Sequence, residues 1–103
     1  DSVNAWRNAM CGHAACNILP VVTSNRIGRE YMTEDRKSHL DFYGSSFIAD
    51  HEGQVVEQAG RDQEEVLVHR FNFQKVKEYR DSWAVFRDRR PDLYGALTTL
   101  DGG

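Results

Sequence analysis

Residues 45–59 have the sequence SSFIADHEGQVVEQA, which predicts a β-hairpin. Two short apolar runs, residues 45–49 and residues 54–59, flank the polar turn Asp50-His51-Glu52-Gly53. Gly53 stands at the turn position that most often needs a positive φ. The hairpin is the most clearly signalled element of the chain, and predicted elements flank it on both sides.

A helix is predicted before the hairpin, over residues 3–17. Asp1 and Ser2 are both residue types that cap helix N-termini, and Val3, Trp6 and Met10 recur at helical spacing. Pro20 prevents the helix from continuing. Residues 19–23 are apolar on both faces, so we expect a short buried strand that runs parallel to its neighbours. Residues 26–41 are dense in charge and are expected to form a long loop.

A strand and a second helix are predicted after the hairpin. Residues 65–71 alternate between two faces and therefore predict a strand that completes a three-stranded meander. Asn72 is a good N-cap for a helix whose apolar stripe contains Phe73, Val76 and Trp83. We expect this stripe to anchor the helix on the sheet. Residues 91–103 follow as an extended tail.

This order of elements indicates an α/β fold, with about four strands and two helices on one face. The chain has 103 residues, enough for a single domain, 1–103. One face of the predicted sheet has no helix left to cover it. The domain therefore looks like a partial one.

The composition excludes several classes of protein. Thirteen basic residues against 16 acidic residues give a net charge of −3, which argues against a generally basic nucleic-acid or membrane-surface binder. No apolar run approaches the roughly 20 residues of a membrane span, and no signal peptide is apparent. Two cysteines are too few for a disulfide scaffold and favour a reducing, cytoplasmic location.

The first predicted helix carries the only close group of possible metal ligands, Cys11, His13 and Cys16. At about 100° per residue, Cys11 points away from the other two side chains, and no second cluster supplies a fourth ligand. We therefore expect no metal and no other cofactor. A Cys16–His13 catalytic dyad is equally disfavoured, because no orienting acid or oxyanion hole is evident.

Two other groups of polar residues invite a functional interpretation. Ser24 and Asn25 follow a predicted strand, and ligands of open α/β sheets gather at strand ends, although a simple polar turn explains them equally well. Arg87, Arg89 and Arg90 form the basic cluster, but Asp88 and Asp92 are interleaved with them. This mixture favours surface ion pairs or a subunit contact over phosphate binding.

Three segments closely resemble the C-terminal part of N-carbamoylputrescine amidases, a branch of the nitrilase or carbon–nitrogen hydrolase superfamily. They are WRNAMCGHAACNILPVVTSNRIGRE at residues 6–30, FYGSSFIADHEGQVVEQAG at residues 42–60, and SWAVFRDRRPDLY at residues 82–94. The resemblance covers essentially the whole chain. It implies that the chain is the C-terminal portion of a four-layer α-β-β-α sandwich, in which a missing N-terminal part supplies the second sheet.

The activity implied by the resemblance is hydrolysis of N-carbamoylputrescine, a step of polyamine biosynthesis, without a cofactor. The superfamily uses a cysteine nucleophile, which attacks the poorly electrophilic ureido carbon, a glutamate general base, and a lysine that stabilises the tetrahedral intermediate. None of the three can be assigned here, because Cys11 and Cys16 lie in the helix downstream of the catalytic segment. This chain alone is therefore expected to be inactive.

The resemblance does carry over some secondary positions. Asn25, Tyr43 and Ser45 match positions near the mouth of the pocket and are expected to line a site for a small carbamoyl amine. Arg87, Arg89 and Arg90 are expected at a contact with a second copy or with the missing part. A different hypothesis stays open, in which the chain is a stand-alone, non-catalytic module that associates through its exposed sheet.

Overall fold

The predicted hairpin forms one side of the central sheet in a computed structural model that describes all residues from Asp1 to Gly103. Strands β4 (Phe47–Ala49) and β5 (Val55–Gln58) are antiparallel. A carboxylate oxygen of Asp50 accepts from the backbone nitrogens of Glu52 and Gln54, each at 2.9 Å. Gly53 has a φ of 81°, which confirms the expected use of glycine in this turn.

Strand β1 (Val21–Thr23) pairs with the other edge of β4, with Val21 opposite Ala49. The pairing is antiparallel, so the expectation of a parallel strand was wrong. The reason is topological. The chain runs outward from β1, turns, and returns into β4, and these two strands must therefore run in opposite directions.

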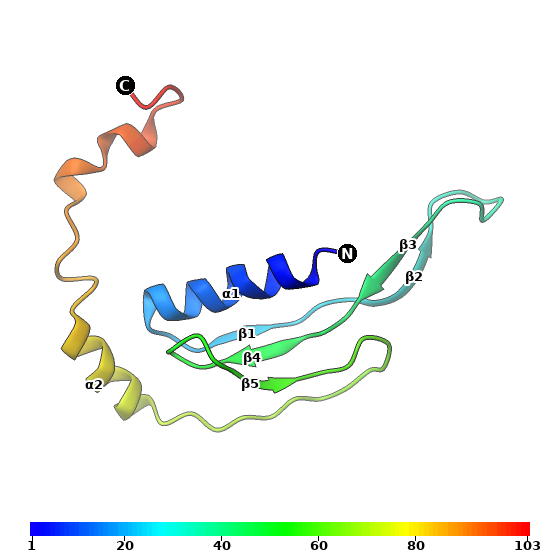
Figure 1. The fold of residues 1–103 in the computed structure, drawn as a ribbon, viewed down its shortest axis with the longest axis horizontal. Helices are drawn as coiled ribbons and strands as arrows, with labels where there is room; N and C mark the ends of the chain where they lie inside the picture. The colour runs from blue at the N-terminus through cyan, green and yellow to red at the C-terminus, as the bar shows by residue number, and fades with distance from the viewer.

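The segment that was expected to be a loop, residues 26–41, is a hairpin instead. Its strands are β2 (Ile27–Tyr31) and β3 (His39–Tyr43), which pair antiparallel over five residue pairs. The hairpin projects from the body as an arm (Figure 1), so most of its side chains are exposed on both faces. Hydrophobic alternation is absent for that reason. Cross-strand charge pairs such as Arg29–Asp41, with contacts of 2.6 and 2.9 Å, take its place.

Helix α1 (Val3–Asn17) has the predicted bounds and packs on one face of the sheet. Ala14, Phe47 and Ala49 are fully buried there, with Trp6 and Met10 against them. The helix ends at Ile18, whose left-handed backbone donates its N–H to the carbonyls of Ala14 and Ala15. Only 8 of the 103 residues are buried, and Ile18, Ile48 and Val76 are the only buried hydrophobic residues outside this small cluster.

Residues 65–71 are extended but belong to no sheet, contrary to the predicted third strand of a meander. Their alternation was recognised correctly, but no strand of this chain pairs with them. Helix α2 (Phe73–Trp83) follows, beginning directly after the predicted cap. Its N-cap is confirmed, because the side chain of Asn72 accepts from the backbone nitrogen of Lys75 at 3.2 Å.

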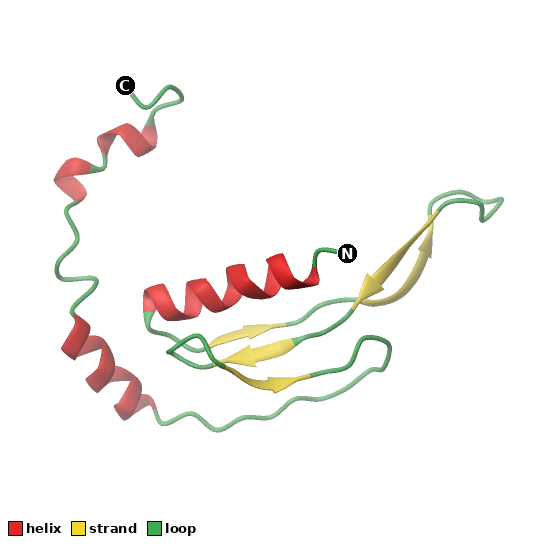
Figure 2. Ribbon diagram, in the orientation of Figure 1, coloured by secondary structure: helices red, strands yellow, loops and turns green.

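The apolar stripe of α2 does not anchor the helix on the sheet, so that expectation was wrong. Phe73 is 69% and Trp83 61% exposed, and only Val76 is buried. The helix lies past the end of the strands (Figure 2), where Tyr79 stacks edge-on against His51 with ring centroids 5.1 Å apart. Of the two helices, α1 alone covers the sheet face.

The C-terminal tail contains two 3₁₀ turns, η1 (Pro91–Leu93) and η2 (Gly95–Thr98), and forms a second arm. The molecule measures 55 × 43 × 16 Å with a radius of gyration of 18.5 Å. A compact domain of this length would have a radius of about 13 Å. The α/β fold is confirmed, as a thin, open plate with two arms. Neither α1 nor α2 combines the length and the apolar composition that a membrane-spanning helix requires.

Candidate functional site

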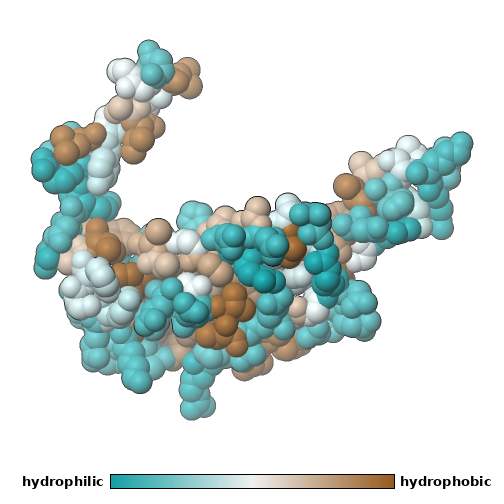
Figure 3. Space-filling view, viewed as in Figure 1, coloured by the Kyte–Doolittle hydropathy of each residue, from teal (hydrophilic) through white to brown (hydrophobic).

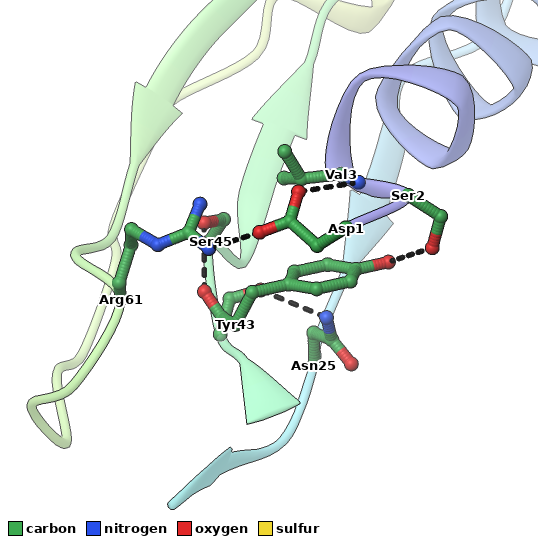
Figure 4. Close-up of polar contacts among 8 residues, drawn as sticks. Asp1, Ser2, Val3, Asn25, Tyr43, Ser45 and Arg61 are labelled. Carbon is green, nitrogen blue, oxygen red and sulfur yellow. Dashed lines mark hydrogen bonds and ion pairs between the residues drawn. The ribbon is translucent and has the colours of Figure 1, made fainter. Parts of the chain in front are cut away.

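The predicted site residues meet where the arm joins the sheet, between β1 and β2 on one side and β3 and β4 on the other (Figure 4). We call Asn25 and residues 43–46 the junction. The side-chain nitrogen of Asn25 donates to the Gly44 carbonyl at 2.8 Å, and its side-chain oxygen accepts from the Arg26 backbone nitrogen at 2.9 Å. The Ser46 hydroxyl accepts from the Asn25 backbone nitrogen at 2.8 Å. Asn25 therefore holds the segment between β1 and β2 against the segment between β3 and β4.

These bonds hold two consecutive residues in left-handed conformation, Gly44 with φ 54° and Ser45 with φ 60°. A Cβ atom at Gly44 would lie 2.8 Å from the Arg61 carbonyl oxygen, so the position requires glycine. Ser45 is 2% exposed, and its hydroxyl donates to the Tyr43 carbonyl at 2.9 Å. A non-glycine residue in this conformation is uncommon and marks a locally strained backbone.

Tyr43 points toward the beginning of α1. Its hydroxyl lies 3.4 Å from the Ser2 hydroxyl, and its ring lies 5.9 Å from the Trp6 ring. The Arg61 guanidinium lies over the same ring, 5.9 Å from its centroid, and forms an ion pair with Asp1. These contacts tie the first residues of the chain to the loop after β5.

An open hollow of about 790 Å³ lies beside the junction. Ser24, Asn25 and Ser46 line it from the junction, and Gly60, Glu64 and Glu65 line it from the loop after β5. The structure thus brings Asn25, Tyr43 and Ser45 together, but of these three only Asn25 lines the hollow. Ser46, which follows Ser45 in the same Gly-Ser-Ser run, lines the hollow in place of Ser45.

Opposite charges next to the junction pair both along β2 and across the arm to β3. Arg26 contacts Glu30 at 2.7 Å, and Arg29 holds Asp41 with two hydrogen bonds. The Arg29 guanidinium lowers the pKa of Asp41, and Asp41 in turn raises the pKa of Arg29. Both pairs are solvent-exposed, so each contributes little to stability on its own.

The cysteines lie away from the junction. Cys11 is half-buried between α1 and the sheet, whereas Cys16 is exposed, and both are free. No three His, Cys, Asp or Glu side chains form a cluster that could hold a metal ion.

The basic cluster lies on the segment between α2 and η1. Arg87 pairs with Asp88 at 2.8 Å and Arg90 with Asp92 at 2.6 Å. Arg89 instead donates to the Phe86 carbonyl at 3.0 Å. These contacts match the interleaved charges seen in the sequence.

Known proteins resemble this chain along its whole length. The carbon–nitrogen hydrolase family matches residues 2–81. N-carbamoylputrescine amidases of Solanum tuberosum and Arabidopsis thaliana are each 52% identical over 103 residues, covering 99% of this chain. A citrullinase of Francisella tularensis is 43% identical over 98 residues.

One solved structure has the same arrangement. A carbon–nitrogen hydrolase from Helicobacter pylori superposes with a TM-score of 0.86 at 34% sequence identity, covering 96% of this chain. This chain spans about a third of each relative, 34% of both plant enzymes and 34% of the H. pylori chain. The open backbone of this chain is therefore also found in the H. pylori protein, whose chain is about three times as long.

Proposed function

The chain belongs to the carbon–nitrogen hydrolase family, and from that premise we propose that it is one part of an amidohydrolase that cleaves N-carbamoylputrescine. Water and N-carbamoylputrescine would give putrescine, ammonia and carbon dioxide, a reaction of polyamine biosynthesis. The observation that carries the proposal is the 52% identity to two plant N-carbamoylputrescine amidases over the whole chain.

The relatives also suggest the chemical class of the substrate. N-carbamoylputrescine and citrulline both carry a terminal ureido group on a linear chain, and enzymes named for each are similar to this chain. The higher identity of the plant enzymes favours the amine over the amino acid. The substrate class that we propose is therefore a carbamoylated linear amine.

We propose that this chain contributes structure and pocket lining, and that the remainder of a full-length enzyme contributes the nucleophile, base and lysine. Cys11 packs between α1 and the sheet, and Cys16 lies on the exposed side of the helix. Neither thiol lines the hollow beside the junction. An activated cysteine needs an adjacent base, and neither Cys11 nor Cys16 forms a hydrogen bond with a His, Asp or Glu side chain.

The junction is the part of this chain that we place at the substrate. Asn25 lines the hollow and retains a second amide hydrogen for a ligand. Tyr43 and Ser45 would support the pocket from behind, because their hydroxyls bond to Ser2 and to the Tyr43 carbonyl. Ser46 is the additional residue that we place at the hollow.

A partner is part of the proposal, either the remainder of a longer chain or a second copy. Arg89, which has no carboxylate partner in this chain, is the member of the basic cluster most available for such a contact, beside Arg87 and Arg90. Both cysteines are free, which fits the cytoplasmic location that we propose.

A chimera tests the function. The segment of the S. tuberosum enzyme that matches this chain would be replaced by residues 1–103, and ammonia release from N-carbamoylputrescine would be compared with release from citrulline. We expect turnover of N-carbamoylputrescine by the chimera and none by the isolated chain. A folded chimera that hydrolyses citrulline and not N-carbamoylputrescine would refute the substrate assignment.

The isolated chain provides the control for the alternative, a non-catalytic module that associates with itself. Turnover by the isolated chain that disappears in Cys16→Ser would show that the nucleophile lies in this chain. A chimera that folds but hydrolyses neither ureido compound would favour the non-catalytic module.

A further inference from the structure

The hollow beside the junction carries one negative charge that no side chain of this structure neutralises. Glu64 and Glu65 both line the hollow from the loop after β5. Glu65 is engaged, because one of its carboxylate oxygens accepts from the Gly60 backbone nitrogen at 2.7 Å. Glu64 is exposed and takes part in none of the ion pairs of the chain. Its carboxylate is therefore free to bind a cation that enters the hollow.

The basic residue of the lining, Arg26, directs its charge elsewhere. Its guanidinium donates to the Glu30 carboxylate at 2.7 Å and lies 4.2 Å from the centroid of the Phe42 ring. Both partners belong to the arm, Glu30 to β2 and Phe42 to β3. The charge of Arg26 is therefore neutralised on the arm and not at Glu64. The lining of the hollow thus attracts a cation at Glu64 and offers no free cation to a carboxylate.

The junction side of the hollow is polar but uncharged. Asn25 keeps one amide hydrogen after its bond to the Gly44 carbonyl. Ser24 and Ser46 line the hollow beside it. The volume of the hollow, about 790 Å³, lies within the range of about 300–1,000 Å³ that small-molecule sites occupy. The hollow therefore suits an elongated ligand with a neutral polar group at one end and a cationic group at the other.

From this distribution of charge we infer that Glu64 determines substrate specificity, by binding the terminal ammonium group of a carbamoylated linear amine. The inference rests on the proposed function, which supplies the substrate class. N-carbamoylputrescine ends in an ammonium group alone, whereas citrulline ends in an ammonium group beside a carboxylate. The Glu64 carboxylate attracts the ammonium group and repels the carboxylate of citrulline. Since specificity is a difference between two affinities, both effects favour the amine.

Kinetics of the S. tuberosum chimera test the inference. Glu64→Gln keeps the size of the side chain and removes its charge. Glu34→Gln is the matched control, because Glu34 is an exposed carboxylate on the arm that forms no ion pair and does not line the hollow. We expect Glu64→Gln to raise KM for N-carbamoylputrescine about 3–5-fold with kcat nearly unchanged, which is the effect of losing one exposed ion pair. Glu34→Gln should change neither constant.

N-pentylurea separates a charge contact from a merely structural role. This compound keeps the ureido group and carries a methyl group in place of the ammonium group, so Glu64→Gln should leave its inhibition constant unchanged. The preference of the chimera for N-carbamoylputrescine over citrulline should fall about 3–5-fold or more in the same variant. Equal KM values for N-carbamoylputrescine in the two variants would overturn the inference. Equal weakening of N-pentylurea binding by Glu64→Gln would overturn it as well.

Putrescine binding to the chimera, measured by isothermal titration calorimetry, gives a second readout that does not depend on turnover. Glu64→Gln should raise the Kd about 3–5-fold, and added salt should reduce this difference because it screens exposed charges. A chimera that hydrolyses neither ureido compound, but in which Glu64→Gln alone weakens putrescine binding, would refute the proposed function and leave the role of Glu64 standing. An active chimera in which Glu64→Gln and Glu34→Gln bind putrescine equally well would refute the role of Glu64 and leave the proposed function standing.

Discussion

The side-chain nitrogen of Asn25 donates to the carbonyl of Gly44 at 2.8 Å, across 19 positions of the sequence. This bond crosses the junction at the point where the arm leaves the sheet. It joins Asn25, which follows a strand end, to the run that contains Tyr43 and Ser45, which the family resemblance marked as pocket lining. Its chemistry shows that Asn25 has a structural task whether or not a ligand binds.

Replacing Asn25 by Ala should destabilise the isolated chain by about 1–3 kcal/mol, because the Gly44 carbonyl and the Arg26 N–H both lose their partner. Urea unfolding followed by circular dichroism at a fixed protein concentration measures the effect. Asn17→Ala is the matched control. Asn17 makes a single exposed bond to the His13 carbonyl and should cost much less. Equal midpoints for the two variants would contradict this structural role of Asn25.

The two glycines at positions 12 and 53 should respond to alanine in opposite directions. Gly53 has a φ of 81°, and an added Cβ would lie 2.8 Å from the Cys11 carbonyl oxygen. We expect Gly53→Ala to cost about 1–3 kcal/mol, from backbone strain and from separation of the β4–β5 turn from α1. Gly12 lies within α1 with nothing within 4 Å of an added Cβ, so Gly12→Ala should stabilise by about 0.5–1 kcal/mol. Unfolding curves that shift in the same direction would refute this account.

The contrast between Phe47 and Trp83 shows where the core of the isolated chain lies. Phe47 is fully buried under Trp6, with ring centroids 5.2 Å apart, whereas Trp83 is 61% exposed. Phe47→Ala should cost about 3–5 kcal/mol and leave little folded protein. Trp83→Ala should change stability by about 0.5 kcal/mol or less. If Trp83→Ala unfolded the chain and Phe47→Ala did not, the core would be misplaced.

Local signals sufficed for the elements that the sequence predicted well. The helical spacing of apolar residues predicted α1, although the Ser2 hydroxyl makes no capping hydrogen bond. The Asn72 cap predicted the start of α2, and Gly53 predicted the β4–β5 turn. Each of these signals depends on residues a few positions apart. The arm was missed because its strands are stabilised by pairs such as Arg29–Asp41, which lie 12 residues apart and leave no apolar period. Residues 65–71 and Trp83 were misplaced for the opposite reason. Their patterns indicate burial, but Val66, Val68 and Trp83 stay largely exposed in this chain.

The candidate site was predictable only in outline. The strand-end position of Asn25 pointed to the junction, where the structure places Asn25 beside the hollow. The backbone at Gly44 and Ser45 is left-handed, Ser45 is buried, and Ser46 lines the hollow. This conformation depends on hydrogen bonds between segments far apart in the sequence, which no local pattern predicts.

The arm should loosen in acid through Asp41. The hydrogen bonds from Arg29 lower the pKa of Asp41, and the charge of His39 adds a smaller effect in the same direction. A carboxyl group with a lowered folded pKa stabilises the fold above its unfolded pKa of about 4 and loses that contribution as pH falls through the lowered value. Amide NMR shifts of residues 27–43 should therefore titrate with a midpoint below about pH 4.

Asp41→Asn should remove this transition. Asp35→Asn should retain it, which separates Asp41 from Asp35, whose pKa is lowered by Thr33. A midpoint at the ordinary carboxyl value would contradict the coupling.

The isolated chain should associate with itself when no other partner is present. Its accessible surface is 7,999 Å², whereas a compact monomer of this mass would expose about 5,900 Å². The excess of about 2,000 Å² per chain is the size of an obligate interface rather than of an ordinary surface. Separate apolar patches lie among hydrophilic side chains on the face shown in Figure 3. Val22, 71% exposed, lies on the sheet face opposite α1. Burial of that face between two copies would use side chains and leave the backbone of residues 65–71 unpaired.

Sedimentation at micromolar concentration should show dimers or larger species, and Val22→Lys should shift them toward monomer. Leu100→Lys, at the end of the tail, is the matched control and should have no effect. A chain that stays monomeric at tens of micromolar would show that the exposed face needs no cover.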